Sequence, residues 1–122
     1  MAKPRILIVE DDASVREALA IFLEGEGYSV VEAGDGAEAL AQLRGSEPFG
    51  LILLDLMMPV MNGWEFRDAQ TSDPTLASIP VVVITADNSA VQQVARAGVA
   101  GCLLKPLEFP DLLTYVGRYC GA

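Results

Sequence analysis

Acidic residues follow two apolar segments of the sequence, at the point where each segment ends. Glu10 and Asp11 follow the run at residues 6–9, and Asp55 follows the run at residues 51–54. A charged group at the end of a buried strand costs free energy unless a cation or a hydrogen-bond donor meets it. Taken alone, Asp55 is equally consistent with a residue that turns to water and caps the following loop.

Two further apolar runs end in groups whose chemistry complements these carboxylates. Thr85 ends the run at residues 81–84 with a hydroxyl, and Lys105 follows the run at residues 101–104 with an ammonium. An ammonium beside carboxylates is suited to binding an incoming phosphoryl oxygen, and a hydroxyl can donate to another oxygen. The four run ends together favour phosphoryl chemistry.

Three carboxylates at one buried edge would repel one another, and at least one of them would have a raised pKa. A hard divalent cation removes that conflict. Mg²⁺ uses one or two protein carboxylates and keeps waters that a phosphate can replace, and Mn²⁺ suits the same oxygen ligands. With such an ion and Lys105 to spread the charge of the transition state, Asp55 could attack phosphorus and form an acyl phosphate.

Each of these residues also has a purely structural explanation. Asp11 or Asp12 can serve only as the N-cap of the following helix, and Thr85 can be an ordinary β-branched strand residue. Lys105 can simply neutralise Asp55 in an ion pair. Because four separate runs end in groups of complementary chemistry, the functional interpretation is favoured for the set as a whole.

The order of the predicted elements decides whether these groups meet. Continuous apolar runs, typical of strands covered on both faces, alternate with helical patterns. Strands are predicted over residues 5–9, 28–32, 51–55, 80–85 and 101–104, and helix starts at a Ser14/Glu17 capping box, at Asp35, at Asn62, at Asp87 or Ser89, and at Pro110. This alternation predicts an α/β fold with a parallel sheet, whose carboxyl strand ends share one edge.

The composition restricts the classes of function. The 122 residues fit a single domain over residues 1–122, and no apolar run approaches the roughly 20 residues that cross a bilayer. The net charge of −9 argues against direct binding of nucleic acid or a membrane surface, because phosphate contacts need clustered Lys and Arg. The absence of His excludes His-based catalysis and His-ligated metal sites. The N-terminus has no signal-peptide pattern, so we predict a cytoplasmic protein.

Four sequence blocks together resemble the receiver domain of two-component response regulators. They are ILIVEDD at residues 6–12, LLDLMMPVMNG at residues 53–63, ITA at residues 84–86 and LKP at residues 104–106. The resemblance spans essentially the whole chain. It implies a doubly wound, five-stranded parallel sheet in the order 2-1-3-4-5, the flavodoxin-like (βα)5 fold.

The resemblance also implies a phosphoacceptor and its metal site. Asp55 takes the place of the phosphoacceptor and is a ligand of Mg²⁺. Asp11 corresponds to a second direct metal ligand, whereas Glu10 acts mostly through water. Met57 would give its backbone carbonyl to the metal.

Further roles implied by the resemblance concern the phosphoryl group. Thr85 corresponds to the switch hydroxyl that moves toward this group, and the Ala86 amide is expected to contact it. Lys105 binds a phosphoryl oxygen, and its bond to Pro106 is typically cis in this family.

Two positions depart from the family pattern. Cys102 occupies a position where the family usually carries Tyr or Phe, so we expect the coupling from Thr85 to the output surface to be altered. Residues 98–101 lack the acidic pair through which some DNA-binding regulators dimerise, so that mode of dimerisation is not expected. Cys102 and Cys120 have no CxxC spacing and are predicted to be free thiols.

The function implied is a phosphorylation switch rather than a turnover enzyme. Asp55 would receive a phosphoryl group from a sensor histidine kinase or phosphotransfer protein, and a downstream protein or effector domain would bind the switched surface. No effector domain follows the last predicted helix, so a stand-alone receiver and a fragment of a larger regulator are both open. A receiver-like interaction module that works without phosphorylation is the alternative, supported only by Cys102. A metal-dependent phosphohydrolase is disfavoured, because Met57 stands where such enzymes usually have a second acid.

Overall fold

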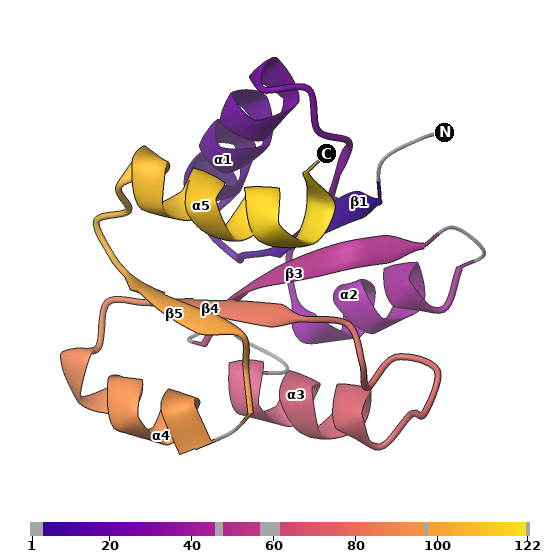
Figure 1. The fold of residues 1–122 in the computed structure, drawn as a ribbon. Helices are drawn as coiled ribbons and strands as arrows, with labels where there is room; N and C mark the ends of the chain where they lie inside the picture. The colour runs from indigo at the N-terminus through magenta and orange to yellow at the C-terminus, as the bar shows by residue number, and fades with distance from the viewer. Residues whose placement is uncertain (1–3, 46–47, 57–61, 97, 122) are drawn as a thin grey trace.

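The computed structural model describes residues 4–45, 48–56, 62–96 and 98–121 (Figure 1). Five strands alternate with helices along the chain. The strands are β1 (Arg5–Val9), β2 (Val30–Ala33), β3 (Phe49–Asp55), β4 (Val81–Thr85) and β5 (Gly101–Leu104). The helices are α1 (Ala13–Gly25), α2 (Gly36–Leu43), α3 (Gly63–Thr71), α4 (Val91–Arg96) and α5 (Phe109–Cys120), with a 3₁₀-helix η1 (Asn88–Ala90) before α4.

The strands form one sheet in the order β2-β1-β3-β4-β5. Each neighbouring pair is parallel. Helices α1 and α5 cover one face of the sheet, and α2, α3 and α4 cover the other (Figure 1). This three-layer arrangement confirms the predicted doubly wound α/β fold with the order 2-1-3-4-5.

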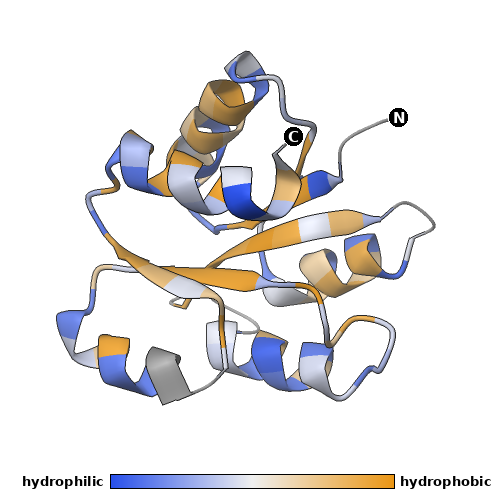
Figure 2. Ribbon diagram, in the orientation of Figure 1, coloured by the Kyte–Doolittle hydropathy of each residue, from blue (hydrophilic) through white to orange (hydrophobic). Residues whose placement is uncertain are grey.

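The central strand β3 supplies both halves of the core. Leu51 and Leu53 pack with residues of α1 and α5, whereas Ile52 and Leu54 pack with residues of α2 and α3. All four side chains are at most 1% exposed, and burial of each contributes about 1.5–3 kcal/mol. Figure 2 shows that the strands of the sheet are coloured mostly hydrophobic along their length. A continuous apolar run therefore indicates a strand that is covered on both faces.

The helix starts were predicted with mixed success. The capping box predicted at Ser14 and Glu17 is wrong: the N-cap lies two residues earlier, at Asp12, whose carboxylate accepts hydrogen bonds from the amides of Ser14 and Val15 at 2.9 and 3.3 Å. The structural role considered for Asp12 from the sequence, that of N-cap, is thus confirmed, and Asp12 stands directly before the first helical residue. A complete capping box occurs instead at the predicted start of α3, where Asn62 and Glu65 satisfy each other's amides.

The strand predicted from residue 28 starts later, at Val30. The Tyr28 amide closes the end of α1 by donating to the Leu23 carbonyl at 3.1 Å, so this residue belongs to the helix–strand connection. Gly27 precedes it with a φ of 92°, a conformation that favours glycine and ends the helix. The β-branched and aromatic composition of residues 28–31 indicated a strand from residue 28. Tyr28 instead donates a hydrogen bond to the C-terminal end of α1 and is not part of the strand.

The two ends of the described chain meet beside the start of β3. A Cβ atom at Gly50 would lie 2.7 Å from the Pro4 Cβ and 2.9 Å from the Cys120 Sγ. Pro4 directly precedes β1, and Cys120 is the last residue of α5. Gly50 is therefore required by close packing, and both Pro4 and Cys120 lie at the amino edge of the sheet.

Candidate functional site

The groups expected to carry the chemistry lie at the carboxyl edge of the sheet. Asp55 is the last residue of β3, and Thr85 is the last residue of β4. Glu10 directly follows β1, and Lys105 directly follows β5. The parallel pairing brings these ends together, as the sequence predicts, because β1, β3, β4 and β5 are consecutive neighbours in the sheet.

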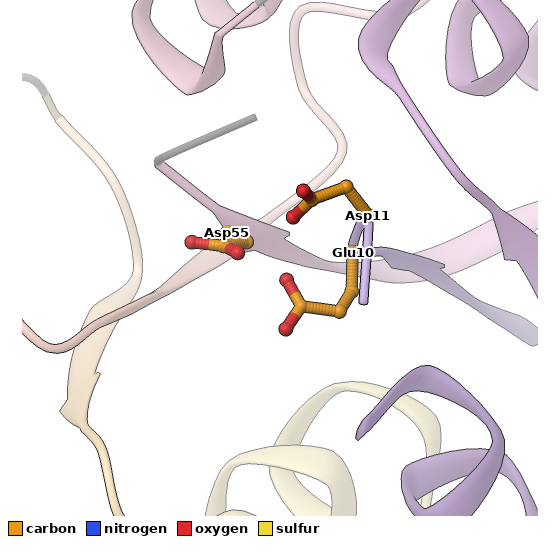
Figure 3. A group of neighbouring side chains, drawn as sticks. All are labelled: Glu10, Asp11 and Asp55. Atoms are coloured by element: carbon orange, nitrogen blue, oxygen red, sulfur yellow. The ribbon is translucent and has the colours of Figure 1, made fainter. Parts of the chain in front are cut away.

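Three carboxylates converge at this edge. One carboxylate oxygen each from Glu10, Asp11 and Asp55 lies within 4.8 Å of the other two. Figure 3 shows the Glu10 and Asp11 side chains reaching from the end of β1 toward Asp55. Glu10 and Asp55 are buried, with 3% and 5% exposure, whereas Asp11 is exposed. Solvent therefore reaches the three carboxylates from the side of Asp11, whereas Glu10 and Asp55 are shielded from solvent.

Lys105 contacts both buried carboxylates. Its Nζ lies 3.0 Å from the Glu10 Oε1 and 3.4 Å from the Asp55 Oδ2. Burial alone would lower the pKa of Lys105, but the hydrogen bond to Glu10 and the charge of Asp55 outweigh it and raise the pKa. The predicted cis bond between Lys105 and Pro106 is present. The shorter contact, to Glu10, was not predicted.

Among the carboxylates of the site, Glu10 has a raised pKa. Burial raises its pKa to about 7, and the neighbouring Asp55 adds to this effect against the opposing influence of Lys105. Its Oε2 is buried and has no hydrogen-bond partner within the described part of the chain. Hard divalent cations and their waters bind such oxygens, so the donor set fits Mg²⁺.

Thr85 is placed at the same edge but is engaged elsewhere. It is 1% exposed, and its Oγ1 accepts a hydrogen bond from the Asp87 amide at 3.1 Å. Ala86, between them, is exposed. Met57, expected to offer its carbonyl to a metal, lies outside the described residues. The structure therefore brings together three carboxylates and one ammonium, with a hydroxyl close by in the next strand.

Cys102 lies in β5 opposite Val83 and packs partly buried against the core layer that contains α2 and α3. Burial raises the pKa of its thiol. Cys102 and Cys120 are both free, as predicted. A small thiol thus occupies the strand position at which a large ring was expected from the family pattern.

A family model for the response regulator receiver domain matches residues 6–117. The chain belongs to this family. The DNA-binding response regulator MtrA of Mycolicibacterium paratuberculosis is 38% identical over 116 residues, which are 93% of this chain and 50% of MtrA. The chain therefore spans about half the length of the curated relatives to which it is similar.

Solved structures agree with this assignment. A response regulator receiver protein from Pseudomonas putida has a TM-score of 0.89 and 30% identity, over 97% of this chain and 98% of that protein. The response regulator TrrA of Thermotoga maritima, solved in complex with Mg²⁺ and BeF, has a TM-score of 0.82 and 26% identity, over 95% and 98% of the two chains. This chain is a signalling receiver domain of two-component systems. Each helix within the described ranges is too short or too polar to cross a bilayer.

The raised pKa of Glu10 predicts how the stability of this receiver domain depends on pH without metal. The ordinary pKa of 4.5 applies to the unfolded chain, and about 7 applies to the folded one. The folded state binds more protons than the unfolded chain between these two pH values. The contribution of Glu10 to stability is therefore greatest below about pH 4.5 and is lost as the pH rises through about 7. We expect the urea midpoint in EDTA to fall between pH 5 and pH 8. Saturating Mg²⁺ should reduce the fall, because a cation stabilises the ionised carboxylate.

Glu10→Gln provides the control for this measurement, since it removes the titrating group and keeps a similar shape. The fall between pH 5 and pH 8 should be smaller in this variant. The lowered pKa values of Asp73 and Asp87 act below their ordinary value of 3.8 and do not contribute in that range. An identical pH profile in Glu10→Gln and wild type would contradict the assignment.

Gly63 fixes the backbone that follows Asp55. Its amide donates to the Leu56 carbonyl at 3.0 Å. A Cβ atom at this position would lie 2.7 Å from the Leu56 Cα and 3.0 Å from the Asp55 carbonyl oxygen. A third neighbour, the Leu56 Cδ2 at 2.8 Å, belongs to a side chain, but the other two atoms are backbone and cannot move aside. The sequence predicted only that α3 starts here; the close approach of α3 to the end of β3 was missed.

Gly63→Ala should therefore destabilise the receiver domain by about 1–3 kcal/mol, the usual cost of overpacking. Gly25→Ala is a matched control, because a Cβ atom there meets nothing within 4 Å. That variant should be unchanged or more stable by up to about 1 kcal/mol. Urea unfolding of both variants and wild type measures the difference. Equal stability of the two variants would contradict the packing described for Gly63.

Arg16 is a second residue of the site that the sequence analysis missed. Its Nη1 donates to the Glu10 carbonyl at 2.9 Å, and its Nε lies 3.2 Å from the Glu32 Oε1. Arg16 stands in the first turn of α1, four residues after the Asp12 cap, so its side chain lies at the same edge. The only sequence signal for this role of Arg16 is its position on the first turn of the helix that follows Glu10 and Asp11.

Proposed function

We propose that Asp55 is the phosphoacceptor of this receiver domain and that Mg²⁺ is bound by Asp11 and Asp55, with Glu10 acting through water. The observation that supports this most strongly is the convergence of the three carboxylates with Lys105 at one edge. The complex of the similar protein TrrA with Mg²⁺ and BeF is consistent with it. Met57 is retained as the expected carbonyl ligand, and Mn²⁺ as a substitute ion.

The proposed reaction is a transfer between a phosphohistidine and Asp55. A carboxylate oxygen of Asp55 attacks phosphorus, the P–N bond breaks, and the imidazole nitrogen leaves with its electron pair. The product on this chain is an acyl phosphate. The Lys105 ammonium, already 3.4 Å from the Asp55 carboxylate, binds a phosphoryl oxygen as charge develops. When bound, Mg²⁺ supplies the remaining neutralisation of carboxylate and phosphoryl charge.

Switching then requires Thr85 to change its partner. Its hydroxyl turns from the Asp87 amide toward the phosphoryl group, and the Ala86 amide donates to that group as well. The change shifts the population of a partner-binding surface. Cys102 cannot transmit the shift as an aromatic ring would, so we infer that coupling through β5 is weaker than in receivers with Tyr or Phe there.

The proposed partners are a sensor histidine kinase or phosphotransfer protein on the input side and a downstream protein or effector domain on the output side. We infer a cytoplasmic setting, and the acidic net charge of −9 disfavours direct contact of this domain with nucleic acid. The domain over residues 1–122 is proposed to act as one unit, as a stand-alone receiver or as part of a longer regulator.

Intact-mass spectrometry tests this proposal. Wild type incubated with a small acyl phosphate donor and Mg²⁺ should gain a single phosphoryl group, and EDTA should prevent the gain. Hydroxylamine should remove the group, because it cleaves acyl phosphates but not phosphoserine or phosphothreonine. A folded, Mg²⁺-binding wild type that gains no phosphoryl group would overturn the proposal and favour the phosphorylation-independent interaction module.

A further inference from the structure

The direction of the Glu10–Asp11 peptide decides whether the acidic group can form. Successive side chains of an extended chain point to opposite sides. Glu10 and Asp11 nevertheless both reach toward Asp55 from the end of β1 (Figure 3). The backbone must therefore be held at the peptide that joins them, since a rotation there would turn one carboxylate away.

Repulsion among the carboxylates acts against this arrangement. Two of the three are buried, but Asp11 is exposed and can turn its charge to water at little cost. The Lys105 ammonium forms its ion pairs with Glu10 and Asp55, and among the described residues it forms none with Asp11. Something other than Lys105 has to hold the peptide from which Asp11 projects.

Arg16 makes the contact that can do this. Its Nη1 donates at 2.9 Å to the Glu10 carbonyl, which belongs to the peptide joining Glu10 to Asp11. Its Nε lies 3.2 Å from the Glu32 carboxylate on β2, and this second contact holds the guanidinium in the orientation that reaches the Glu10 carbonyl. The Arg16 side chain is only 20% exposed. A planar guanidinium can serve both acceptors at once, whereas an ammonium has no such fixed geometry.

We propose that Arg16 is a positioning residue of the metal site: it fixes the Glu10–Asp11 peptide so that both carboxylates face Asp55, and Glu32 holds its guanidinium in place. This inference rests on the proposed function of the site as a Mg²⁺ site. Arg16 acts through the backbone and is itself not a ligand. Groups that orient metal ligands in this way change metal affinity by about 10–100-fold when they are removed.

The sign of the effect separates positioning from simple charge. Loss of a positive charge near an acidic group strengthens its attraction for a cation, so charge alone predicts tighter Mg²⁺ binding in Arg16→Ala. Positioning predicts weaker binding, by about tenfold or more. Arg16→Lys keeps the positive charge but loses the planar guanidinium that contacts the Glu10 carbonyl and the Glu32 carboxylate together. Weaker Mg²⁺ binding in this variant would therefore result from the lost contacts and not from a lost charge. Arg44→Ala, at an exposed arginine after α2, is the matched control.

Isothermal calorimetry with Mg²⁺ on the full chain, and thermal unfolding in EDTA, test the proposal. We expect Arg16→Ala to bind Mg²⁺ about tenfold more weakly, Arg16→Lys to lie between it and wild type, and Arg44→Ala to stay within twofold of wild type. Unchanged or tighter binding in Arg16→Ala, with or without a lower melting temperature, would overturn the proposal. If Arg16→Ala does not fold, wild-type affinity in Arg16→Lys overturns it. A wild type that binds no Mg²⁺ would overturn the proposed metal site and this inference together.

Discussion

An Asp55→Asn variant is expected to gain no phosphoryl group under conditions in which wild type is modified to completion. The amide that replaces the carboxylate is not a nucleophile toward phosphorus and cannot form an acyl phosphate. The substitution also removes one of the three mutually repelling charges, so the variant should remain folded. Intact-mass spectrometry with a small acyl phosphate donor and Mg²⁺ measures the loss, and circular dichroism checks the fold.

Asp68→Asn is the matched control, because it makes the same chemical change at an exposed residue of α3 outside the acidic group. This variant should be modified as fully as wild type. A phosphoryl group on Asp55→Asn at the wild-type level would show that another residue is the acceptor. Loss in both variants would instead point to an indirect effect of the substitutions.

Replacing Lys105 by methionine should lower the rate of phosphorylation by about 100-fold or more. The ammonium lies 3.4 Å from the Asp55 carboxylate, and removal of one such electrostatic donor typically costs about 10²–10³ in rate. Mg²⁺ should bind at least as tightly as in wild type, because the ammonium no longer competes for Glu10 and Asp55. Time courses of the mass shift at saturating Mg²⁺ give the rate.

Lys3→Met controls for the loss of a lysine, since Lys3 is the only other lysine of the sequence. Its rate should equal that of wild type. If Lys105→Met is phosphorylated within threefold of the wild-type rate, Lys105 serves only as a structural partner of the buried carboxylates. Weaker Mg²⁺ binding in Lys105→Met would likewise contradict its proposed role, because the rate loss would then follow from the metal.

The fold and the location of the site at the carboxyl edge of the sheet could both be predicted from the sequence. Continuous apolar runs of four or five residues are characteristic of parallel strands covered on both faces, and β3 shows this at Leu51 to Leu54. Once the strands are parallel, Asp55 and Thr85 must share an edge. The errors lie at element ends: the predicted Ser14/Glu17 capping box did not form, although the alternative N-cap at Asp12 did, and Tyr28 joined the turn after α1. Competing local hydrogen-bond partners decide such ends.

The finer geometry of the site depends on contacts between residues that are distant in the sequence. Lys105 and Glu10 are separated by 95 positions, and no spacing rule connects them. Arg16 contacts Glu32 because the start of α1 lies beside β2, and the clash that excludes a side chain at Gly63 arises only when α3 packs on the end of β3. Residue types could indicate that such groups have partners, but not which partners they have.

The meeting of Pro4, Gly50 and Cys120 at the amino edge of the sheet bears on how this domain can be used as a component. The acidic group occupies the opposite, carboxyl edge, so peptides or fluorescent proteins joined directly before Pro4 or after Cys120 start from the side away from the chemistry. Both attachment points are close to each other, which favours energy transfer between two fused fluorophores. Circularly permuted versions should likewise tolerate a short bridge from Cys120 to Pro4, with new termini opened in an exposed loop. The same geometry makes the domain suited to insertion within a host protein as a phosphorylation-dependent sensor.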